Sequence, residues 1–212
     1  MHQVLRLLSK VAERYAPSRL LSFDSVHVLK TMQLMENKKR ISRSLLMHEL
    51  GLGEGSVKTL VKHMKMSGLI ENSNAGMWPT NKGRTVHAKL HCAIPAETDI
   101  FKCSIALGKF NYAVLVKDIA YNVGSGIEQR DAAIKLGAVG ATTLIFKNDR
   151  LLMTDTQEDL LRNNPKIHSL IIKKLVPSDN DVIIIGSSDN KRTAELAAKS
   201  AALHTIANHE KH

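Results

Sequence analysis

Residues 41–85, ISRSLLMHELGLGEGSVKTLVKHMKMSGLIENSNAGMWPTNKGRT, decide the fold of the N-terminal half of the chain. Ser42 is a favoured N-cap for a first short helix, and Gly51 is a common residue just beyond a helix end. The segment GLGEG predicts a tight turn, because glycine tolerates positive φ values. A second helix is expected over residues 56–67, and LIEN, SNAG and MWPT predict a two-stranded hairpin. Together these elements predict an all-α winged helix-turn-helix domain over residues 1–91.

The second helix of this domain has one apolar face and one basic face. Val57, Leu60, Val61 and Met64 recur at i, i+3, i+4 and i+7, which indicates an inward stripe. A basic, hydroxyl-bearing outer face suits a helix laid in the DNA major groove, where lysine can donate to guanine O6 and N7. We expect duplex DNA to be read by Ser56, Lys58, Thr59, Lys62 and His63.

The charge of the chain is distributed unevenly. The formal net charge is +10 at pH 7; residues 1–90 hold 15 Lys and Arg against 6 Asp and Glu, and the rest holds 15 against 14. The basic excess therefore lies on the winged-helix half, where phosphate contacts would form. Aromatic residues make up only 4% of the chain, which argues against stacking of single-stranded bases. The expected phosphate contacts are Lys38, Lys39, Arg40, Arg43, Lys82 and Arg84.

The cysteines and the hydropathy pattern bear on where the protein works. Cys92 and Cys103 form no CxxC motif or disulfide framework, which indicates a reducing compartment. No apolar run approaches the ~18 residues of a membrane span. The N-terminus lacks a small-residue cleavage site, so a signal peptide is not expected. The sequence predicts a cytoplasmic protein without a membrane partner.

Two features of the N-terminal half leave alternatives open. The apolar stripe of a first helix, which includes Val4, Leu8 and Val11, either packs on the winged-helix core or pairs with a second subunit. DNA readers of two-fold sites often need the second arrangement, so a homodimer is expected. His87 and His91 have the i, i+4 spacing of metal ligands and are followed by Cys92, but no acidic residue or further cysteine lies nearby in sequence, and both histidines can simply face solvent. We therefore expect no metal and no cofactor.

After a linker at residues 92–98 the pattern changes, and a second domain is expected over residues 97–207. Strand-like runs and helical runs alternate in the order ββαββαβα. Hairpins followed by helices favour an α+β two-layer ββαββα sandwich with an extra βα unit over a doubly wound fold. The strands are expected at residues 99–107, 111–118, 141–148, 150–154 and 181–186, and the helices at 126–137, 157–175 and 190–206.

Two glycine- and serine-rich corners lead from a strand into a helix in this second domain. Free backbone N–H groups at such helix starts attract anions, which makes a small anionic ligand a reasonable expectation. The alternative is that these residues only make turns and caps. No GxxxxGK[ST], GxSxG or HExxH motif occurs in the chain. The candidate ligand-binding residues are Gly124, Ser125, Gly126, Gln129, Arg130, Asp131, Ser187 and Ser188.

Two blocks of sequence carry a resemblance to a known family. They are LGLGEGSVKTL at residues 50–60, and GIEQRDAAI at residues 126–134 with the GA and GATTL segments that follow it. The chain resembles an archaeal family of winged-helix proteins with a C-terminal domain of unknown function. The resemblance implies a winged helix followed by a domain similar to the GAD-type two-layer sandwich, and at best a role in transcriptional regulation. It implies no ligand and no catalytic residue.

Three functions remain in view. The first is a dimeric DNA-binding transcriptional regulator whose C-terminal domain senses a small ligand or dimerises. The second is an enzyme acting on a nucleotide or sugar phosphate, which would depend on Arg130 or Asp131 and has no obvious nucleophile beside them. The third is a winged helix that binds RNA or protein, since basic charge alone does not separate DNA from RNA. The first is preferred, and an enzyme is the less favoured reading.

Overall fold

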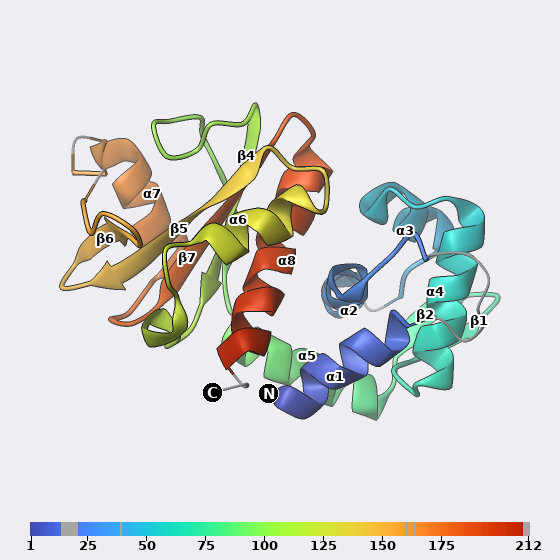
Figure 1. The fold of residues 1–212 in the computed structure, drawn as a ribbon. Coiled ribbons are helices and arrows are strands. Elements are labelled where there is room, and N and C mark those ends of the chain that lie inside the picture. The colour runs from blue at the N-terminus through green and yellow to red at the C-terminus, as the bar shows by residue number, and fades with distance from the viewer. Residues whose placement is uncertain (14–20, 39, 160, 163, 210–212) are drawn as a thin grey trace. The chain divides into compact units, whose positions relative to one another are not determined.

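The computed structural model describes residues 1–13, 21–38, 40–159, 161–162 and 164–209. The chain separates into two compact units, Met1–Leu90 and His91–His212, here called unit 1 and unit 2. Unit 1 is largely helical, and unit 2 is built on a five-stranded antiparallel sheet, so the fold is mixed α and β (Figure 1).

Unit 1 contains five helices and one hairpin in its described part. The helices are α1 (His2–Val11), α2 (Ser25–Lys38), α3 (Arg43–Leu50), α4 (Glu54–Met66) and α5 (Asn81–Ala93), and the strands are β1 (Ile70–Ser73) and β2 (Gly76–Pro79). The predicted helix–turn–helix–hairpin order is therefore present in the structure.

Local capping explains where α3 ends and α4 begins. The Ser42 hydroxyl accepts a hydrogen bond from the Leu45 N–H at 3.1 Å, and Gly51 takes the left-handed conformation with φ of 67°. The next helix starts at Glu54, earlier than expected, so Gly55 lies within α4 rather than in the turn. The turn between the two helices is only residues 51–53, which fixes α4 tightly against α3.

The hairpin is tied to the segment that precedes α3. β1 pairs antiparallel with β2, with Ile70 opposite Pro79. Ile41 adds a further bridge on β2: its N–H donates to the Met77 carbonyl at 3.0 Å, and the Met77 N–H donates back at 2.9 Å. The hairpin is thus anchored at the start of α3.

The first helix packs within its own unit. Val4, Leu5, Leu8 and Val11 are buried, and α1 contacts α2 and α4. Of the two alternatives for this apolar stripe, packing on the core of unit 1 accounts for its burial. A second subunit is not needed to cover it.

Unit 2 is organised around its central strand. The strand order is β3-β4-β7-β5-β6, and each neighbouring pair is antiparallel. Every residue of β7 is buried. The elements are β3 (Glu97–Ile100), β4 (Phe110–Val116), the 3-10 turn η1 (Ala120–Asn122), α6 (Ile127–Ile134), β5 (Gly140–Lys147), β6 (Arg150–Met153), α7 (Pro165–Leu175), β7 (Val182–Ser188) and α8 (Lys191–His209).

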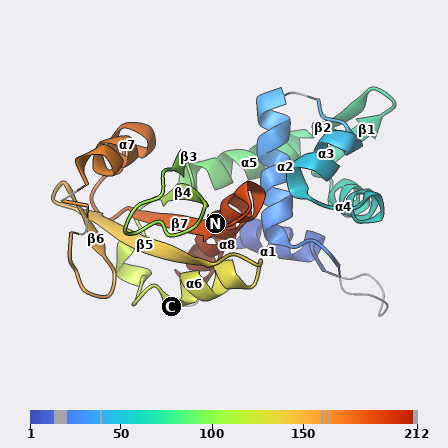
Figure 2. The same ribbon diagram turned by 90° about the horizontal axis from the view of Figure 1, so that it is seen from above.

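Helices cover both faces of this sheet. On one face Ile183 and Ile185 of β7 join a core that includes Ile171 of α7. On the other face α8 lies so close to the sheet that a Cβ on Gly186 would come within 2.5 Å of the Ala194 carbonyl oxygen. Figure 2 shows α7 and α6 on opposite sides of the strands. The predicted two-layer sandwich was wrong: unit 2 has three layers, because a strand buried on both sides needs a cover on both.

Three predicted boundaries in unit 2 also need correction. β3 begins at Glu97, inside the expected linker, and residues 101–107 form a loop with a single Cys103–Ala106 bridge. α7 begins at Pro165 and not at residue 157. Proline is favoured at a first helical position because its N–H would be unpaired there in any case.

Close packing of α5 on the residue before the hairpin predicts a stability difference between two glycines. A Cβ on Gly83 would lie 2.1 Å from the Leu69 carbonyl oxygen, whereas a Cβ on Gly55 meets nothing within 4 Å. We expect Gly83→Ala to destabilise unit 1 by about 1–3 kcal/mol through overpacking. Gly55→Ala should stabilise it by up to about 1 kcal/mol, because alanine is the better helix former.

Urea unfolding followed by tryptophan fluorescence measures this difference in unit 1, because Trp78 is the single tryptophan of the chain. Equal midpoints for the two variants would contradict the close contact between Gly83 and Leu69.

Candidate nucleic-acid interface

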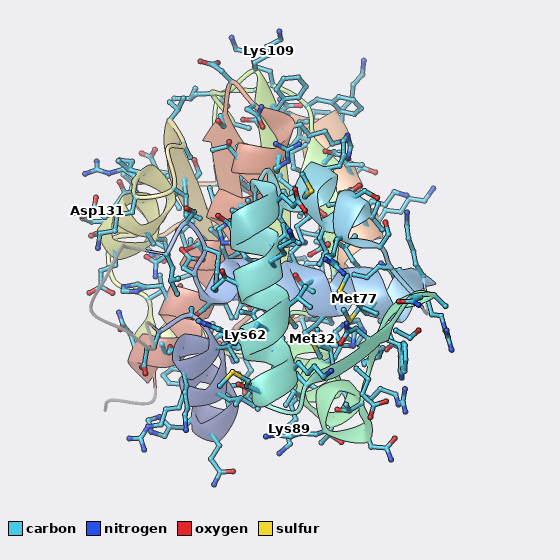
Figure 3. All side chains as sticks on the ribbon, turned by 90° about the vertical axis from the view of Figure 1, so that its right-hand side faces the viewer. Met32, Lys62, Met77, Lys89, Lys109 and Asp131 are labelled. Carbon is cyan, nitrogen blue, oxygen red and sulfur yellow. The ribbon has the colours of Figure 1, made fainter. Side chains whose placement is uncertain are left out.

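The outward side of α4 carries a basic stripe. Lys58, Lys62 and Lys65 are exposed and follow one another at i, i+4 and i+7, so they share one side of the helix. The apolar stripe on the inner side, which includes Leu60 and Met64, is buried. Figure 3 shows α4 from its open side, with Lys62 labelled on it.

The basic stripe is partly neutralised at its N-terminal end. Lys58 Nζ lies 2.8 Å from Glu54 Oε1, one turn away on the same helix. The hydrogen bond and positive charge of Lys58 hold the pKa of Glu54 below its usual value. Beside this pair, the Thr59 hydroxyl donates to the Gly55 carbonyl at 3.0 Å, and Ser56 is half-buried. Of the expected base-reading residues, Lys62 is the exposed cation that lies beyond this Glu54–Lys58 pair, one turn further along α4.

His63 does not lie on the outward face, and its expected role in base reading needs correction. Its side chain is only 5% exposed, and Nδ1 lies 2.8 Å from the Val11 carbonyl oxygen at the end of α1. The ring also meets Phe23 edge-on at 5.8 Å between centroids. His63 therefore ties α4 to α1 through the carbonyl of Val11, the last residue of α1.

The expected phosphate-contacting residues near the hairpin lie on the surface. Lys38, Arg40 and Arg43 are exposed, and Lys39 falls outside the described residues. The Arg40 guanidinium lies 4.7 Å from the centre of the Trp78 ring, which holds this cation against β2. A depression of about 500 Å³ separates the start of α3 from the hairpin tip, and Arg43 and Ser42 line it.

The two basic residues at the base of the hairpin bond to the backbone of their own unit. Lys82 Nζ donates to the Ser67 carbonyl at 2.8 Å, just after α4 ends. Arg84 donates to the Pro79 carbonyl at 3.1 Å and to Asn81 Oδ1 at 2.8 Å. Both side chains stay exposed, so their remaining N–H groups face solvent.

The first glycine-rich corner of unit 2 lines a polar depression of about 380 Å³. Gly126 is the N-cap of α6 with φ of 83°, and Asn122 Nδ2 is buried there without a hydrogen-bond partner. Glu128 lies at the rim and accepts a hydrogen bond from Asn208 at 2.7 Å. Gln129 also lines the depression, but its side-chain amide donates to the Thr205 hydroxyl at 2.9 Å and so serves the packing of α6 on α8. Gly124 and Ser125 complete the expected residues at this depression.

The other expected ligand residues do not line this depression. Arg130 and Asp131 lie on the exposed side of α6. Ser187 is buried, and its hydroxyl donates to Asn111 Oδ1 at 2.7 Å. The Ser188 hydroxyl accepts from the Asn190 N–H at 3.3 Å, close to the start of α8. The structure thus gives the two serines roles in strand pairing and turn formation and does not join the two corners into one site.

Sequence reasoning missed a buried charged cluster between α8 and the sheet edge. Lys199 Nζ lies 2.6 Å from Glu195 and 3.0 Å from Glu97, and 5.7 Å from the centre of the Tyr112 ring. Burial, followed by the nearby carboxylates of Glu97 and Glu195, strongly raises the pKa of Tyr112. The i, i+4 spacing of Glu195 and Lys199 is a sequence signal of this cluster, whereas Glu97 falls in the expected linker at residues 92–98. The cluster holds α8 on β3 and β4.

In the part of the chain that the structure describes, no group of three His, Cys, Asp or Glu side chains is placed so that it could hold a metal ion. Among the helices of this described part, none combines the length and the apolar character needed to span a membrane.

Comparisons with known proteins find a domain family of unknown function and a hypothetical archaeal protein of similar fold. A family model described as a domain of unknown function (DUF4443) matches residues 107–206, within unit 2. The solved structure of a hypothetical protein, PH0730, from Pyrococcus horikoshii OT3 is similar, with a TM-score of 0.67 and 24% sequence identity over 89% of this chain and 92% of that chain. No curated protein matches the chain. These likenesses bear on the fold and carry no activity.

The buried position of His63 predicts a structural effect that its exposed neighbour lacks. We expect His63→Ala to lower the stability of unit 1 by about 2–4 kcal/mol, through a cavity and the loss of the bond to the Val11 carbonyl. Lys62→Ala, on the surface one residue away, should change it by less than about 0.5 kcal/mol. Urea unfolding monitored by Trp78 fluorescence compares them, and a neutral His63→Ala would mean that His63 does not hold α1 in place.

Proposed function

We propose that unit 1 is a winged helix-turn-helix domain that binds duplex DNA, and that the chain is a transcriptional regulator working in the cytoplasm. The observation that supports it best is the exposed stripe of Lys58, Lys62 and Lys65 on α4. A helix of this width fits the major groove, and lysine is suited both to phosphates and to guanine edges.

The arrangement around α4 supports the winged-helix interpretation. α3 precedes α4 through a turn of residues 51–53, as the supporting helix of a helix-turn-helix does. The β1–β2 hairpin follows α4 directly, and Ile41 adds a single bridge to Met77 of β2. In this proposal the hairpin is the wing.

The cations around the wing supply the proposed phosphate contacts. Lys38, Arg40 and Arg43 are exposed near the start of α3, and Arg40 is held in place by Trp78. Phosphate contacts of this kind set the register of a protein on DNA but carry little sequence information. Sequence preference would come from α4, chiefly from Lys62.

Unit 2 is proposed to join two copies or to sense a small anionic ligand at the depression of α6. Gly126 and the start of α6 offer backbone N–H groups that attract an anion. The negative charge of the Glu128 carboxylate at the rim repels an anion and so weakens this site. The similarity of unit 2 to GAD-type domains is also part of this proposal. The order of strands and helices supports it, whereas the helices on both faces of the sheet differ from a two-layer sandwich.

Replacing single lysines on α4 tests the reader helix. We expect Lys62→Ala to weaken binding to a random-sequence duplex and to reduce the slope of log K against log salt by about 0.9, the value for one lost phosphate contact. Lys58→Ala should cost less, because Glu54 already neutralises Lys58. Fluorescence anisotropy over a salt series measures both, with Lys174→Ala on α7 as a matched control.

Unchanged affinity and slope for both α4 variants would reject α4 as the reader. A tRNA pool added as competitor distinguishes DNA binding from RNA binding. If tRNA displaces the DNA duplex at equal nucleotide concentration, RNA is the favoured partner.

The pairing of Glu54 with Lys58 predicts a gain of binding. Glu54→Gln removes one negative charge from the outward face of α4 and releases Lys58 from its partner at 2.8 Å. Duplex affinity at low salt should therefore rise by roughly threefold to tenfold, and the gain should shrink as salt screens it. The same anisotropy series detects it, and a Glu158→Gln variant at an exposed position of unit 2 controls for the change in net charge. A loss of affinity in Glu54→Gln would place the DNA elsewhere.

A further inference from the structure

The glycine at position 55 is not required by the fold of unit 1. Gly55 lies in the first turn of α4, and its φ is outside the left-handed region that favours glycine. A Cβ on Gly55 would meet nothing within 4 Å, whereas one on Gly83 would collide with the Leu69 carbonyl oxygen. Apart from proline, glycine is the least favourable residue in a helix. A remaining reason for a glycine is the close approach of a partner to the main chain.

Gly55 lies on the outward side of α4, in line with the cation that is proposed to read DNA. Lys62 follows Gly55 by seven residues, or about two turns, and both positions are exposed. The side chains next to Gly55 are bonded to the helix itself. Lys58 is held by Glu54 at 2.8 Å, and the Thr59 hydroxyl donates to the Gly55 carbonyl at 3.0 Å. A partner on this side can therefore come close to the main chain of the first two turns.

The C-terminal half of the same side has a different shape. Lys62 and Lys65 are exposed there, and Met66 is 60% exposed. Long side chains thus extend outward from the second half of α4, whereas the first half has a bare main chain at Gly55. The outward side of α4 is therefore narrow at its N-terminal end and broad at its C-terminal end.

The dimensions of nucleic acid grooves decide which partner this shape suits. An α-helix with its side chains is about 10–12 Å wide, and the major groove of B-form DNA is about 12 Å wide. Because the helix nearly fills the groove, a missing side chain lets the helix axis lie closer to the base edges. The major groove of A-form RNA is deep and narrow, and side chains do not reach its base edges. The narrow N-terminal half of α4 suits the groove of DNA.

We propose that Gly55 is the point of closest approach between α4 and the major groove of B-form DNA, so that α4 enters the groove with its first two turns. The absent side chain selects double-stranded DNA over double-stranded RNA, because only the DNA groove admits the helix to this depth. The inference rests on the proposed function of unit 1 and deepens it by naming the form of nucleic acid that α4 recognises.

A cation added at position 55 separates entry into the groove from attraction at its surface. The probe is a DNA duplex enriched from a random-sequence pool by repeated binding to the wild-type chain. Fluorescence anisotropy should show Gly55→Lys binding this duplex at least about tenfold more weakly, although the variant carries one more positive charge. Ser169→Lys adds the same charge on the exposed side of α7 and is the matched control. Its affinity should equal that of the wild type or rise slightly.

A smaller substitution and a second duplex separate this effect from misfolding. The methyl group of Gly55→Ala fits the fold, so the urea midpoint of this variant should equal or exceed that of the wild type. Its affinity for the enriched duplex should still fall by about threefold or more. Gly55→Lys should bind an unselected random duplex at least as tightly as the wild type does, because charge dominates such binding. Its preference for the enriched duplex should therefore decrease.

The outcomes distinguish this inference from the proposed function. A Gly55→Lys chain that binds the enriched duplex as tightly as the wild type, or more tightly, overturns the close approach at Gly55 and leaves DNA binding by unit 1 standing. A wild-type chain that binds an RNA duplex of the same sequence as tightly overturns the selection of B-form DNA. Failure of the wild-type chain to enrich any DNA duplex overturns the proposed function of unit 1 and this inference with it.

Discussion

Burial of the apolar stripe of α4 is the constraint on which the rest of unit 1 depends. With 3.6 residues per turn, fixing Leu60 and Met64 against the core sets the rotation of the whole helix about its axis. That rotation turns Lys58 and Lys62 outward on one side and brings His63 against α1 on the other. The bond from His63 to Val11 then holds α1 over the inner side of α4. The side chains that α4 exposes are therefore determined by which of its side chains are buried in the core.

The ends of α3 could be predicted from the sequence, because the contacts that cap a helix join residues only a few positions apart. Ser42 caps the helix that begins one residue later, and Gly51 ends it, through contacts within a few residues. His63 could not be placed in this way, because its partner Val11 lies 52 residues away in the chain. On a helical wheel it falls at the border between the apolar and polar faces, where only tertiary packing decides. In the same way, the polar strand β3 is defined by its neighbour β4 and has no apolar alternation of its own.

The three layers of unit 2 are indicated by the sequence of its central strand β7. An uninterrupted buried run such as Val182–Ser188 indicates a strand covered on both faces, which excludes two layers. For the candidate ligand residues, by contrast, the sequence alone does not distinguish a binding role from a structural one. Glycine and serine at a strand end are equally suited to an anion site and to tight packing, and only the bond from Ser187 to Asn111 separates the two. The complete Lys199 cluster could not be predicted from the sequence, because its residues come from the three separate elements α8, β3 and β4.

The segregation of charge between the units favours association through unit 2 over association through unit 1. Residues 1–90 carry nine more basic than acidic side chains, and residues 91–212 carry one more. Two copies of unit 1 brought together would repel one another unless polyanionic DNA lay between them, whereas two nearly neutral copies of unit 2 meet no such barrier. If unit 2 joins two copies, as proposed, the number of cations that can reach one duplex doubles, and the linked second contact would form at a high effective concentration. The charge distribution therefore supports the proposal that unit 1 contacts DNA and unit 2 associates, over the reverse assignment.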